Sequence, residues 1–392
     1  MFAPDPHLKT ALELFHGGRF GDSIARCEGL WAEGVRSLPL QALLGELRLW
    51  QNRPSEAAEL LSAALTAQSD SVRLKAVLAE SFRRSDRLSQ AAGLYRELRR
   101  GALARKLEAA AGPGWYLLDA PTDGIDLPWV GETRVPVIEA LVDTRQGPRP
   151  AHFFIDTGVG ETLVDPAMAA EAGVQVFGEE AIHFPAGPAG RIGHGLLPRL
   201  TLGGLSVANL PVQVHETRSS MAELLPFPVD GVIGSGLLSR LPVTLDYGRR
   251  SLRLGGDQHV EQGTPFYLTS DQYPLVPARI NNRLDTLLFL DTGMAGTGIA
   301  LPMSTAQAAN VDVLVDAEGI GYGVQNTLPA TPIVCRSVSA AGLERRDLGG
   351  MLLARFRLEH QFGFRIGGLL GDGFIGNGRL RLDFAAMRVL VD

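Results

Sequence analysis

The feature that most constrains this chain is an Asp-Thr-Gly triplet that occurs twice, each time at the end of an apolar run. The first lies in FFIDTGVGETLV (153–164) and the second in LLFLDTGMAGTGIALP (287–302). Such a run predicts a buried strand, and a carboxylate buried at a strand end is costly unless it is neutralised or hydrogen-bonded. Two carboxylates brought together can share one proton, which gives a physical reason for the repeat.

The segments around the triplets also correspond. DGVIGSGLLSRLPVTLDYGRRSLRL (230–254) aligns with GGLLGDGFIGNGRLRLDFAAMRVLV (367–391) without gaps, at one constant offset. The two triplets are separated by nearly the same offset, and the strands that lead to them, VPVIEALVD (135–143) and YPLVPARIN (273–281), match as well. The sequence therefore predicts an internal duplication of one β-rich unit.

The order of strand, Asp-Thr-Gly, short helix, hairpin region, apolar-apolar-Gly and closing strand resembles the pepsin and retropepsin family of aspartic peptidases. The short units are most similar to the bacterial retropepsin-like branch. The motif residues are Asp156, Thr157 and Gly158 with Val232, Ile233 and Gly234, and Asp291, Thr292 and Gly293 with Leu369, Leu370 and Gly371. The resemblance implies an all-β, two-lobed endopeptidase that hydrolyses peptide bonds with an activated water and uses no cofactor.

The resemblance also assigns roles within the triplets. Asp156 and Asp291 are the expected catalytic dyad, one from each lobe. The two glycines allow the backbone to approach closely and to direct an N–H at the carboxylate. The two threonines resemble the family's cross-lobe hydroxyl pair, which bonds to the opposite loop and keeps the dyad rigid.

The sequence departs from the family after each triplet, where Ser or Ala is usual. Val159 and Met294 stand there instead. A serine hydroxyl at that place can bond to a carboxylate and favour its charged form. Its absence predicts a dyad that works nearer neutral pH, and it leaves open a peptide-binding protein of the same fold with weak or no turnover.

Two Gly- and Pro-rich hairpin segments are candidates for flaps that close over a peptide. They are AIHFPAGPAGRIGHG (181–195) and EGIGYGVQNTLPATP (318–332). His183 or Phe184 is the candidate flap residue in the first unit and Tyr322 in the second. An ordinary hairpin role is the competing interpretation for all three.

The segment 1–111 has a different pattern, with apolar residues at three- and four-residue spacing that predicts successive helices. GRFGDSIARCEGL, NRPSEAAELLSAA and DRLSQAAGLYREL start at positions 18, 52 and 86, which gives a constant period. That period, with the small residues Ser23, Ala57 and Ala91 at one position, resembles the tetratricopeptide repeat, whose length is about 34 residues. A plain helical bundle is the alternative, and a third interpretation makes this region the functional part, with the β region as its scaffold.

Residues 71–111 hold ten Lys or Arg against four Asp or Glu. We expect these charges to form a solvated helix face, with a surface for an acidic partner as the alternative. In either case the helical region is expected to recruit or gate substrate, or to bind a protein partner. The expected division of the chain is 1–111 helical repeat, 112–129 linker with a first strand or two, 130–258 first lobe and 259–392 second lobe.

Bulk composition narrows the remaining function classes. A net charge of −6 gives no footprint for nucleic acid. No apolar run in the sequence reaches the length of about 18 residues at which a membrane span is predicted. Two distant cysteines and scattered histidines predict no metal site and no disulfide framework. We expect a cytoplasmic protein, or a periplasmic one if a leader was removed, that acts on peptide or protein substrates. A monomer is possible, because both lobes lie in one chain.

Overall fold

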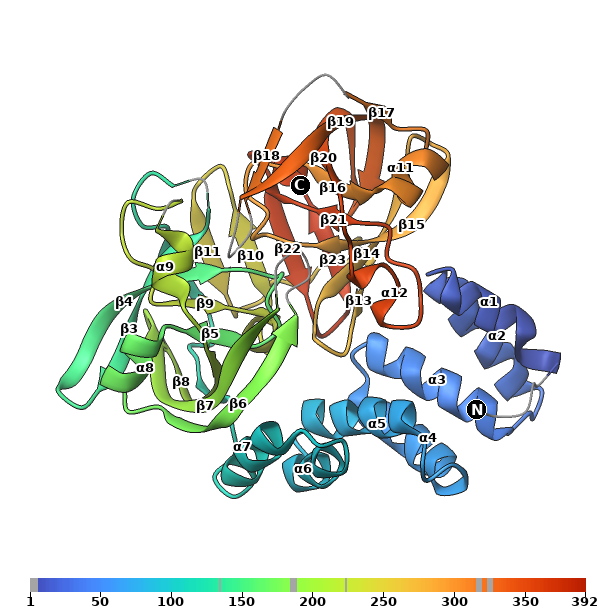
Figure 1. Ribbon diagram of the computed structural model, residues 1–392, viewed down its shortest axis with the longest axis horizontal. Helices are drawn as coiled ribbons and strands as arrows, with labels where there is room; N and C mark the ends of the chain where they lie inside the picture. The colour runs from blue at the N-terminus through green and yellow to red at the C-terminus, as the bar shows by residue number, and fades with distance from the viewer. Residues whose placement is uncertain (1–5, 134, 184–188, 223, 315–318, 323–326) are drawn as a thin grey trace.

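The computed structural model describes residues 6–133, 135–183, 189–222, 224–314, 319–322 and 327–392. It shows a helical region followed by two β lobes, so the predicted fold class is confirmed: an all-α segment and an all-β, two-lobed, acid-protease-like fold. The helices lie along one side of the molecule and reach both lobes (Figure 1). No helix among the described residues is long and apolar enough to cross a membrane.

The helical region is a curved row of antiparallel neighbours. Its elements are η1 (Pro6–Leu8), α1 (Lys9–His16), α2 (Phe20–Ala32), α3 (Leu38–Trp50), α4 (Pro54–Ala67), α5 (Val72–Arg84), α6 (Leu88–Glu97) and α7 (Gly101–Ala111). Helices α2, α4 and α6 begin at one constant spacing along the chain, so the sequence period is the helix-pair period. The small residues of the repeat, Ser23, Ala57 and Ala91, are fully buried. Ser23 Oγ donates to the Ala11 carbonyl at 2.8 Å, which joins α2 to α1.

Lobe 1 is a closed β-barrel. Its ring runs β8-β5-β9-β4-β3-β7 and closes through the pairing of β7 with β8, with β1 and β6 added at its ends. Its elements are β1 (Leu117–Asp119), β3 (Val137–Thr144), β4 (Gly147–Ile155), β5 (Thr162–Val164), α8 (Pro166–Glu171), β6 (Gln175–His183), β7 (Ala189–Leu202), β8 (Leu205–Val214), α9 (Thr217–Met221), β9 (Gly231–Ile233) and α10 (Ser235–Leu238). Strand β4 alternates in burial along its first half and is buried on both faces where it reaches Asp156, which is why the triplet follows a continuous apolar run.

Lobe 2 has the same topology. Its ring runs β14-β15-β21-β16-β20-β19 and closes through β14 and β19. The parallel pairs also correspond: β4 with β9 matches β15 with β21, and β5 with β8 matches β16 with β20. Its elements are β13 (Tyr267–Leu268), β14 (Pro274–Ile280), β15 (Leu284–Leu290), β16 (Ile299–Pro302), α11 (Met303–Ala308), β17 (Asp312–Val313), β18 (Gly319–Tyr322), β19 (Thr327–Ala340), β20 (Leu343–Leu353), α12 (Leu358–Gln361), β21 (Leu369–Leu370) and α13 (Asp372–Ile375).

A third sheet joins the lobes. It runs β12-β23-β22-β10-β11-β2, and its central pair, β10 and β22, places a lobe 1 strand beside a lobe 2 strand. Its strands are β2 (Ile125–Pro128), β10 (Val243–Asp246), β11 (Ser251–Leu254), β12 (Thr264–Pro265), β22 (Arg379–Asp383) and β23 (Arg388–Val391). Residues 112–129 therefore contribute strand β1 to lobe 1 and strand β2 to this shared sheet.

The helical region does not present its basic residues only to solvent. The side chain of Lys106 is fully buried, that of Arg84 is almost fully buried, and that of Arg83 is largely buried. The expectation of a solvated face is therefore wrong for these three residues. Their burial is tolerated because each of them pairs with a carboxylate: Glu80 for the two arginines and Glu161 of lobe 1 for the lysine.

Candidate active site

Each triplet lies at the end of a strand that a short parallel strand holds in place. Strand β4 pairs with β9 and strand β15 with β21. The backbone N–H of Asp156 donates to the Ile233 carbonyl at 3.0 Å, and that of Asp291 donates to the Leu370 carbonyl at 2.9 Å. The apolar-apolar-Gly motifs thus fix the point at which each carboxylate leaves its strand.

The glycines that end these motifs are required by close packing. A β-carbon at Gly234 would lie 2.9 Å from the carbonyl carbon of Val159. One at Gly371 would lie 2.7 Å from the carbonyl oxygen of Met294. Real β-carbons do not approach this closely, so a side chain at either position would push the loop that carries an aspartate out of place.

The two aspartates meet between the lobes. A β-carbon at Gly158 would lie 2.5 Å from Oδ1 of Asp291 and 2.9 Å from Oδ1 of Asp156. One at Gly293 would lie 2.6 Å from Cγ of Asp156. Each glycine therefore touches the aspartate of the opposite lobe, and its N–H donates to its own aspartate: Gly158 to Asp156 at 2.7 Å and Gly293 to Asp291 at 2.9 Å.

The threonines cross-link the two loops reciprocally. The N–H of Thr157 donates to Oγ1 of Thr292 at 3.0 Å, and the N–H of Thr292 donates to Oγ1 of Thr157 at 3.1 Å. Each hydroxyl then donates onward to the opposite strand, Thr157 to the Leu290 carbonyl at 2.7 Å and Thr292 to the Ile155 carbonyl at 3.1 Å. Both threonines are fully buried, so these four bonds hold the carboxylates at a fixed separation.

The electrostatics of the pair favour one retained proton. Asp156 is only 4% exposed, whereas Asp291 is partly exposed. Burial and then the charge of Asp291 raise the pKa of Asp156 well above its usual range. Burial also raises the pKa of Asp291. Like charges this close resist ionising together, which favours a state in which the pair shares one proton.

Two supports of the loops were not singled out from the sequence. Ser235 Oγ donates to the Thr157 carbonyl at 3.0 Å. At the equivalent place in lobe 2, Oδ1 of Asp372 accepts from the N–H of Gly296 at 2.6 Å. Both residues directly follow the apolar-apolar-Gly motif, and that position was the available signal. The correspondence between the two positions was hard to see in the sequence, because lobe 1 has a serine that donates and lobe 2 has an aspartate that accepts.

Val159 and Met294 lie partly buried beside the triplets. Their backbone N–H groups donate to the carbonyls of Asp156 and Asp291, each at 3.3 Å. Their side chains have no hydrogen-bond donor for a carboxylate. The structure thus keeps the turn of each loop while omitting the hydroxyl that would favour the charged form.

The candidate flap residues cannot be placed at side-chain level. His183 ends strand β6, and Tyr322 ends strand β18. Their side chains, and Phe184 as a whole, lie outside the residues that the structure describes. The described residues also hold no group of three or more His, Cys, Asp or Glu side chains suited to a metal ion.

Comparisons with known proteins give one family match. A family model described as aspartyl protease matches residues 138–237, all within lobe 1. Among solved structures, 282 chains match. One of these is the crystal structure of basic 7S globulin from soybean, with 14% sequence identity, 69% of this chain and 96% of that chain covered, and a TM-score of 0.38. No curated protein sequence matches. The family match and the two barrels with facing Asp-Thr-Gly loops support an aspartic-protease-like fold.

Proposed function

We propose that this chain is an aspartic-type endopeptidase whose dyad is Asp156 of lobe 1 and Asp291 of lobe 2. The observation that carries the proposal is the reciprocal bonding of Thr157 and Thr292, which holds a buried carboxylate and a partly exposed one together. The raised pKa values of the two carboxyl groups at one interface also support it, because perturbed carboxyl groups gather at catalytic sites. The substrate class is peptide or protein, and the lobes pair within one chain, so a monomer suffices.

The proposed reaction is a direct attack by water. The ionised carboxylate accepts a proton from a water held between the two groups, while the protonated carboxyl donates its proton to the scissile carbonyl oxygen. The oxygen of the water bonds to the carbonyl carbon and gives a neutral tetrahedral diol. A dyad proton then passes to the leaving nitrogen, the C–N bond breaks, and a hydroxyl of the diol returns its proton to the dyad, so that the carbonyl re-forms as a carboxylic acid and one carboxyl is again protonated. No covalent intermediate and no cofactor are needed.

The pH range of the proposed activity follows from the environment of the dyad. Burial raises both pKa values, the charge of Asp291 raises that of Asp156 further, and the side chains of Val159 and Met294 offer no hydrogen bond that would lower them. The single shared proton should therefore persist toward neutral pH. A pH–rate profile that peaks well below about pH 4 would count against this part of the proposal.

The helical region is proposed to be a tetratricopeptide-like module that recruits substrate or gates the cleft, and that offers a surface to a protein partner. The constant spacing of α2, α4 and α6 supports the repeat interpretation. Contact of α7 with β6 and β7, the strands of the first candidate flap hairpin, supports a gating role. A cytoplasmic location remains a prediction.

The competing function is peptide binding with weak or no turnover. Val159 and Met294 favour it, because they remove the hydroxyls that tune the dyad in the family. Retention of both aspartates, both threonines and both glycines favours catalysis. An interaction protein with a scaffold β domain is the third candidate, and it leaves the buried dyad unexplained.

The deciding experiment is an assay of an unfolded protein substrate between pH 3 and 7 with the unmodified chain, Asp156→Asn and Asp246→Asn. Asp246 also ends a strand, but it lies in the shared sheet and bonds to the Arg249 N–H, so it is the matched control. We expect cleavage by the unmodified chain and by Asp246→Asn, and none by Asp156→Asn. If none of the three cleaves, and an inhibitor with a hydroxyl that mimics the tetrahedral diol does not bind, the binding function replaces the peptidase.

A further inference from the structure

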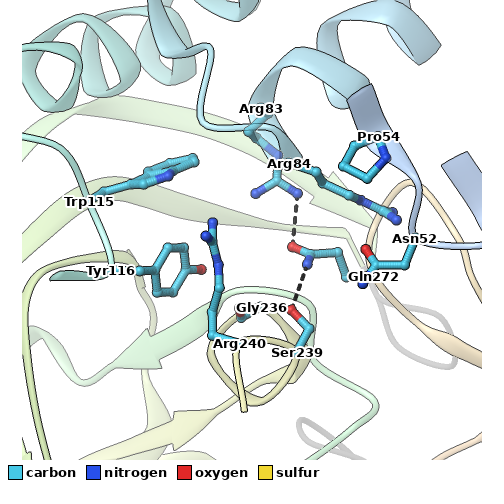
Figure 2. Close-up of a pocket in the computed structure, with 10 residues that line it drawn as sticks. All are labelled: Asn52, Pro54, Arg83, Arg84, Trp115, Tyr116, Gly236, Ser239, Arg240 and Gln272. Carbon is cyan, nitrogen blue, oxygen red and sulfur yellow. Dashed lines mark hydrogen bonds between the residues drawn. The ribbon is translucent and has the colours of Figure 1, made fainter. Parts of the chain in front are cut away.

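A pocket lies where the helical region meets the segment before β1 and both lobes. Its volume is about 190 Å³. The residues that line it are Asn52, Pro54, Arg83, Arg84, Trp115, Tyr116, Gly236, Ser239, Arg240 and Gln272. None of these ten is acidic. Figure 2 shows the guanidinium groups of Arg83 and Arg240 and the ring of Tyr116 gathered around one space.

The charged residues that line the pocket are all basic. Arg83 and Arg84 share one carboxylate, Glu80, at 2.7 and 2.8 Å, and Arg240 pairs with Asp86 at 2.9 Å. Burial opposes ionisation of Glu80, but the two arginines outweigh it and hold its pKa below the usual range. The pKa of Asp86 is also lowered, because hydrogen bonding and attraction from Arg240 outweigh its burial. Three guanidinium groups thus face two ionised carboxylates in these direct ion pairs.

Donors remain without partners at the same place. Tyr116 is 6% exposed, and its hydroxyl has no hydrogen-bond partner among the described residues. The hydroxyl would lie 2.7 Å from a β-carbon at Gly236, so it points at the pocket wall. Burial raises the pKa of Tyr116, so the hydroxyl keeps its proton as a donor. In the hydrogen bonds of the described residues, Nη1 of Arg83 and Nε of Arg240 are unused.

The backbone at this place is strained. Tyr116 has φ of 47° and Gln272 has φ of 63°, both in the left-handed region that large side chains rarely adopt. The guanidinium of Arg240 lies 4.7 Å from the ring centroid of Tyr116, so each fixes the orientation of the other. Strain of this kind persists where the surroundings hold a site in one geometry.

We propose that this pocket binds a small oxyanion, a carboxylate or a phosphate. Guanidinium groups, unused N–H donors and a buried hydroxyl donor are the groups that recognise such an anion. A volume of about 190 Å³ suits inorganic phosphate or a short dicarboxylate rather than a nucleotide. The ligand would bridge Arg83 of the helical region, Arg240 of lobe 1 and Gln272 of lobe 2.

The pocket is one layer of hydrogen bonds from the loop that carries Asp156. The N–H of Gly236, on the pocket wall, donates to the Gly160 carbonyl at 2.6 Å, and the adjacent Ser235 bonds to Thr157. A bound oxyanion would therefore stiffen this loop. Its effect on cleavage rests on the proposed function, whereas binding itself does not.

Binding is tested by calorimetric titration of the full-length chain with inorganic phosphate and, separately, with succinate, at constant ionic strength set by chloride. We expect saturable binding at one site with at least one of the two anions. The arm that saturates identifies the class of ligand. No saturable heat in either arm would overturn the proposal. The Asp156→Asn variant is titrated in parallel, so binding is measured whether or not the chain cleaves peptides.

Variants locate the site. Tyr116→Phe removes only the unpartnered hydroxyl and should weaken binding about tenfold, and Arg240→Gln should weaken it further. Tyr247→Phe is the matched control, because Tyr247 also has a buried hydroxyl without a partner among the described residues, and it does not line the pocket. Unchanged affinity in both Tyr116→Phe and Arg240→Gln would overturn the assignment.

The link to the dyad loop has its own readout. The cleavage rate of the unmodified chain should change over the anion concentrations that fill the pocket. A flat rate across that range would overturn the link. Anion binding without any peptide cleavage would remove the proposed function and leave the binding site standing.

Discussion

The two lobes have the same strand order, but they meet the helical region through different chemistry. Lobe 1 is attached by ion pairs: Lys106 Nζ lies 2.6 Å from Glu161 Oε2, and Arg100 Nη2 lies 3.1 Å from Glu180 Oε2. Lys106 is fully buried, so its pair is shielded from solvent. Glu180 of β6 also accepts from the N–H of Leu103, in the first turn of α7, at 3.4 Å.

Lobe 2 is attached mainly by aromatic packing, with hydrogen bonds from Arg83 to Gln272 and from Arg84 to the Thr269 carbonyl beside it but no ion pair of the kind seen in lobe 1 among the described residues. Phe364 lies edge-on to Phe15 and Phe20, with ring centroids 5.6 and 4.7 Å apart, and Tyr267 lies edge-on to Phe20 at 5.1 Å. The Arg365 N–H donates to the His16 carbonyl at 2.9 Å beside this cluster. Apolar packing of this kind is non-directional and conveys no charge.

The difference indicates which lobe the helical region can influence. Glu161 lies five residues beyond Asp156, and Glu180 lies on the strand that leads to the first candidate flap. The ion pairs of lobe 1 therefore reach both parts of the proposed cleft. Phe364 is not part of the loop of lobe 2 that carries Asp291. We therefore call its aromatic cluster the anchor of lobe 2, because it attaches that lobe to the helical region. The predictions below probe this contrast and the symmetry of the dyad.

The largest expected effect is on catalysis. Asp156→Asn and Asp291→Asn should each lower kcat by about 10²–10⁴-fold, because each removes one of the two groups that exchange the shared proton. The double variant should be no slower than the slower single variant, since the pair acts as a unit. Steady-state kinetics on an unfolded protein substrate measure this. Retained activity in either single variant would show that the lobes do not share one site.

The next effect is on the attachment of lobe 1. Lys106→Met leaves Glu161 buried without its partner, and we expect it to lower the free energy of unfolding by about 3–5 kcal/mol. Because Glu161 follows the Asp156 loop, kcat should also fall in the protein that remains folded. Urea unfolding and single-turnover cleavage measure the two effects.

The control for that prediction is Phe364→Ala in the anchor of lobe 2. It should destabilise by a similar amount, about 3–5 kcal/mol, while the folded fraction keeps its kcat. Adding Glu161→Gln to Lys106→Met should restore much of the stability, since it removes the unpaired charge. Equal loss of kcat in Lys106→Met and Phe364→Ala would remove the distinction between the two attachments.

The third effect tests the cross-link between the loops. Thr157→Val and Thr292→Val each leave a buried N–H and a buried carbonyl without the hydroxyl, at a cost of about 1–3 kcal/mol each. The reciprocal geometry predicts nearly equal losses. Thr162→Val is the matched control, because Thr162 is fully buried and its hydroxyl has no partner among the described residues. If Thr162→Val cost as much as the other two, shape rather than hydrogen bonding would explain the losses.

The sequence alone predicted those parts of the candidate site that belong to a motif of a few consecutive residues. Asp156 and Asp291 stood out because a carboxylate at the end of an apolar strand is rare, and its recurrence gave the pairing. The apolar-apolar-Gly motifs could be found because short parallel strands with a close approach have a local pattern. The fold class followed from the change of period from helical to strand-like near residue 112.

The sequence could not give contacts between distant helices and strands. Lys106 and Glu161 are 55 residues apart, and on a basic helix Lys106 appears as one more solvated charge. Its burial depends on where α7 packs, which no local pattern encodes. The pocket with Arg83, Tyr116 and Arg240 is hidden for the same reason, because its lining comes from separate segments of the chain.

The smallest effect separates the two aspartates by their exposure. A carboxyl whose pKa is raised on folding does not weaken the fold below the unfolded-state pKa of about 3.9, and weakens it increasingly as the pH rises toward the folded-state pKa. Asp156→Asn should therefore raise the melting temperature at pH 7 by roughly 2 °C and leave it unchanged near pH 4. Asp291→Asn should do less, because Asp291 is partly exposed. Thermal unfolding at both pH values, with Asp246→Asn as control, measures this. A gain that is equal at the two pH values, or larger for Asp291→Asn, would contradict a dyad in which lobe 1 supplies the more buried carboxyl.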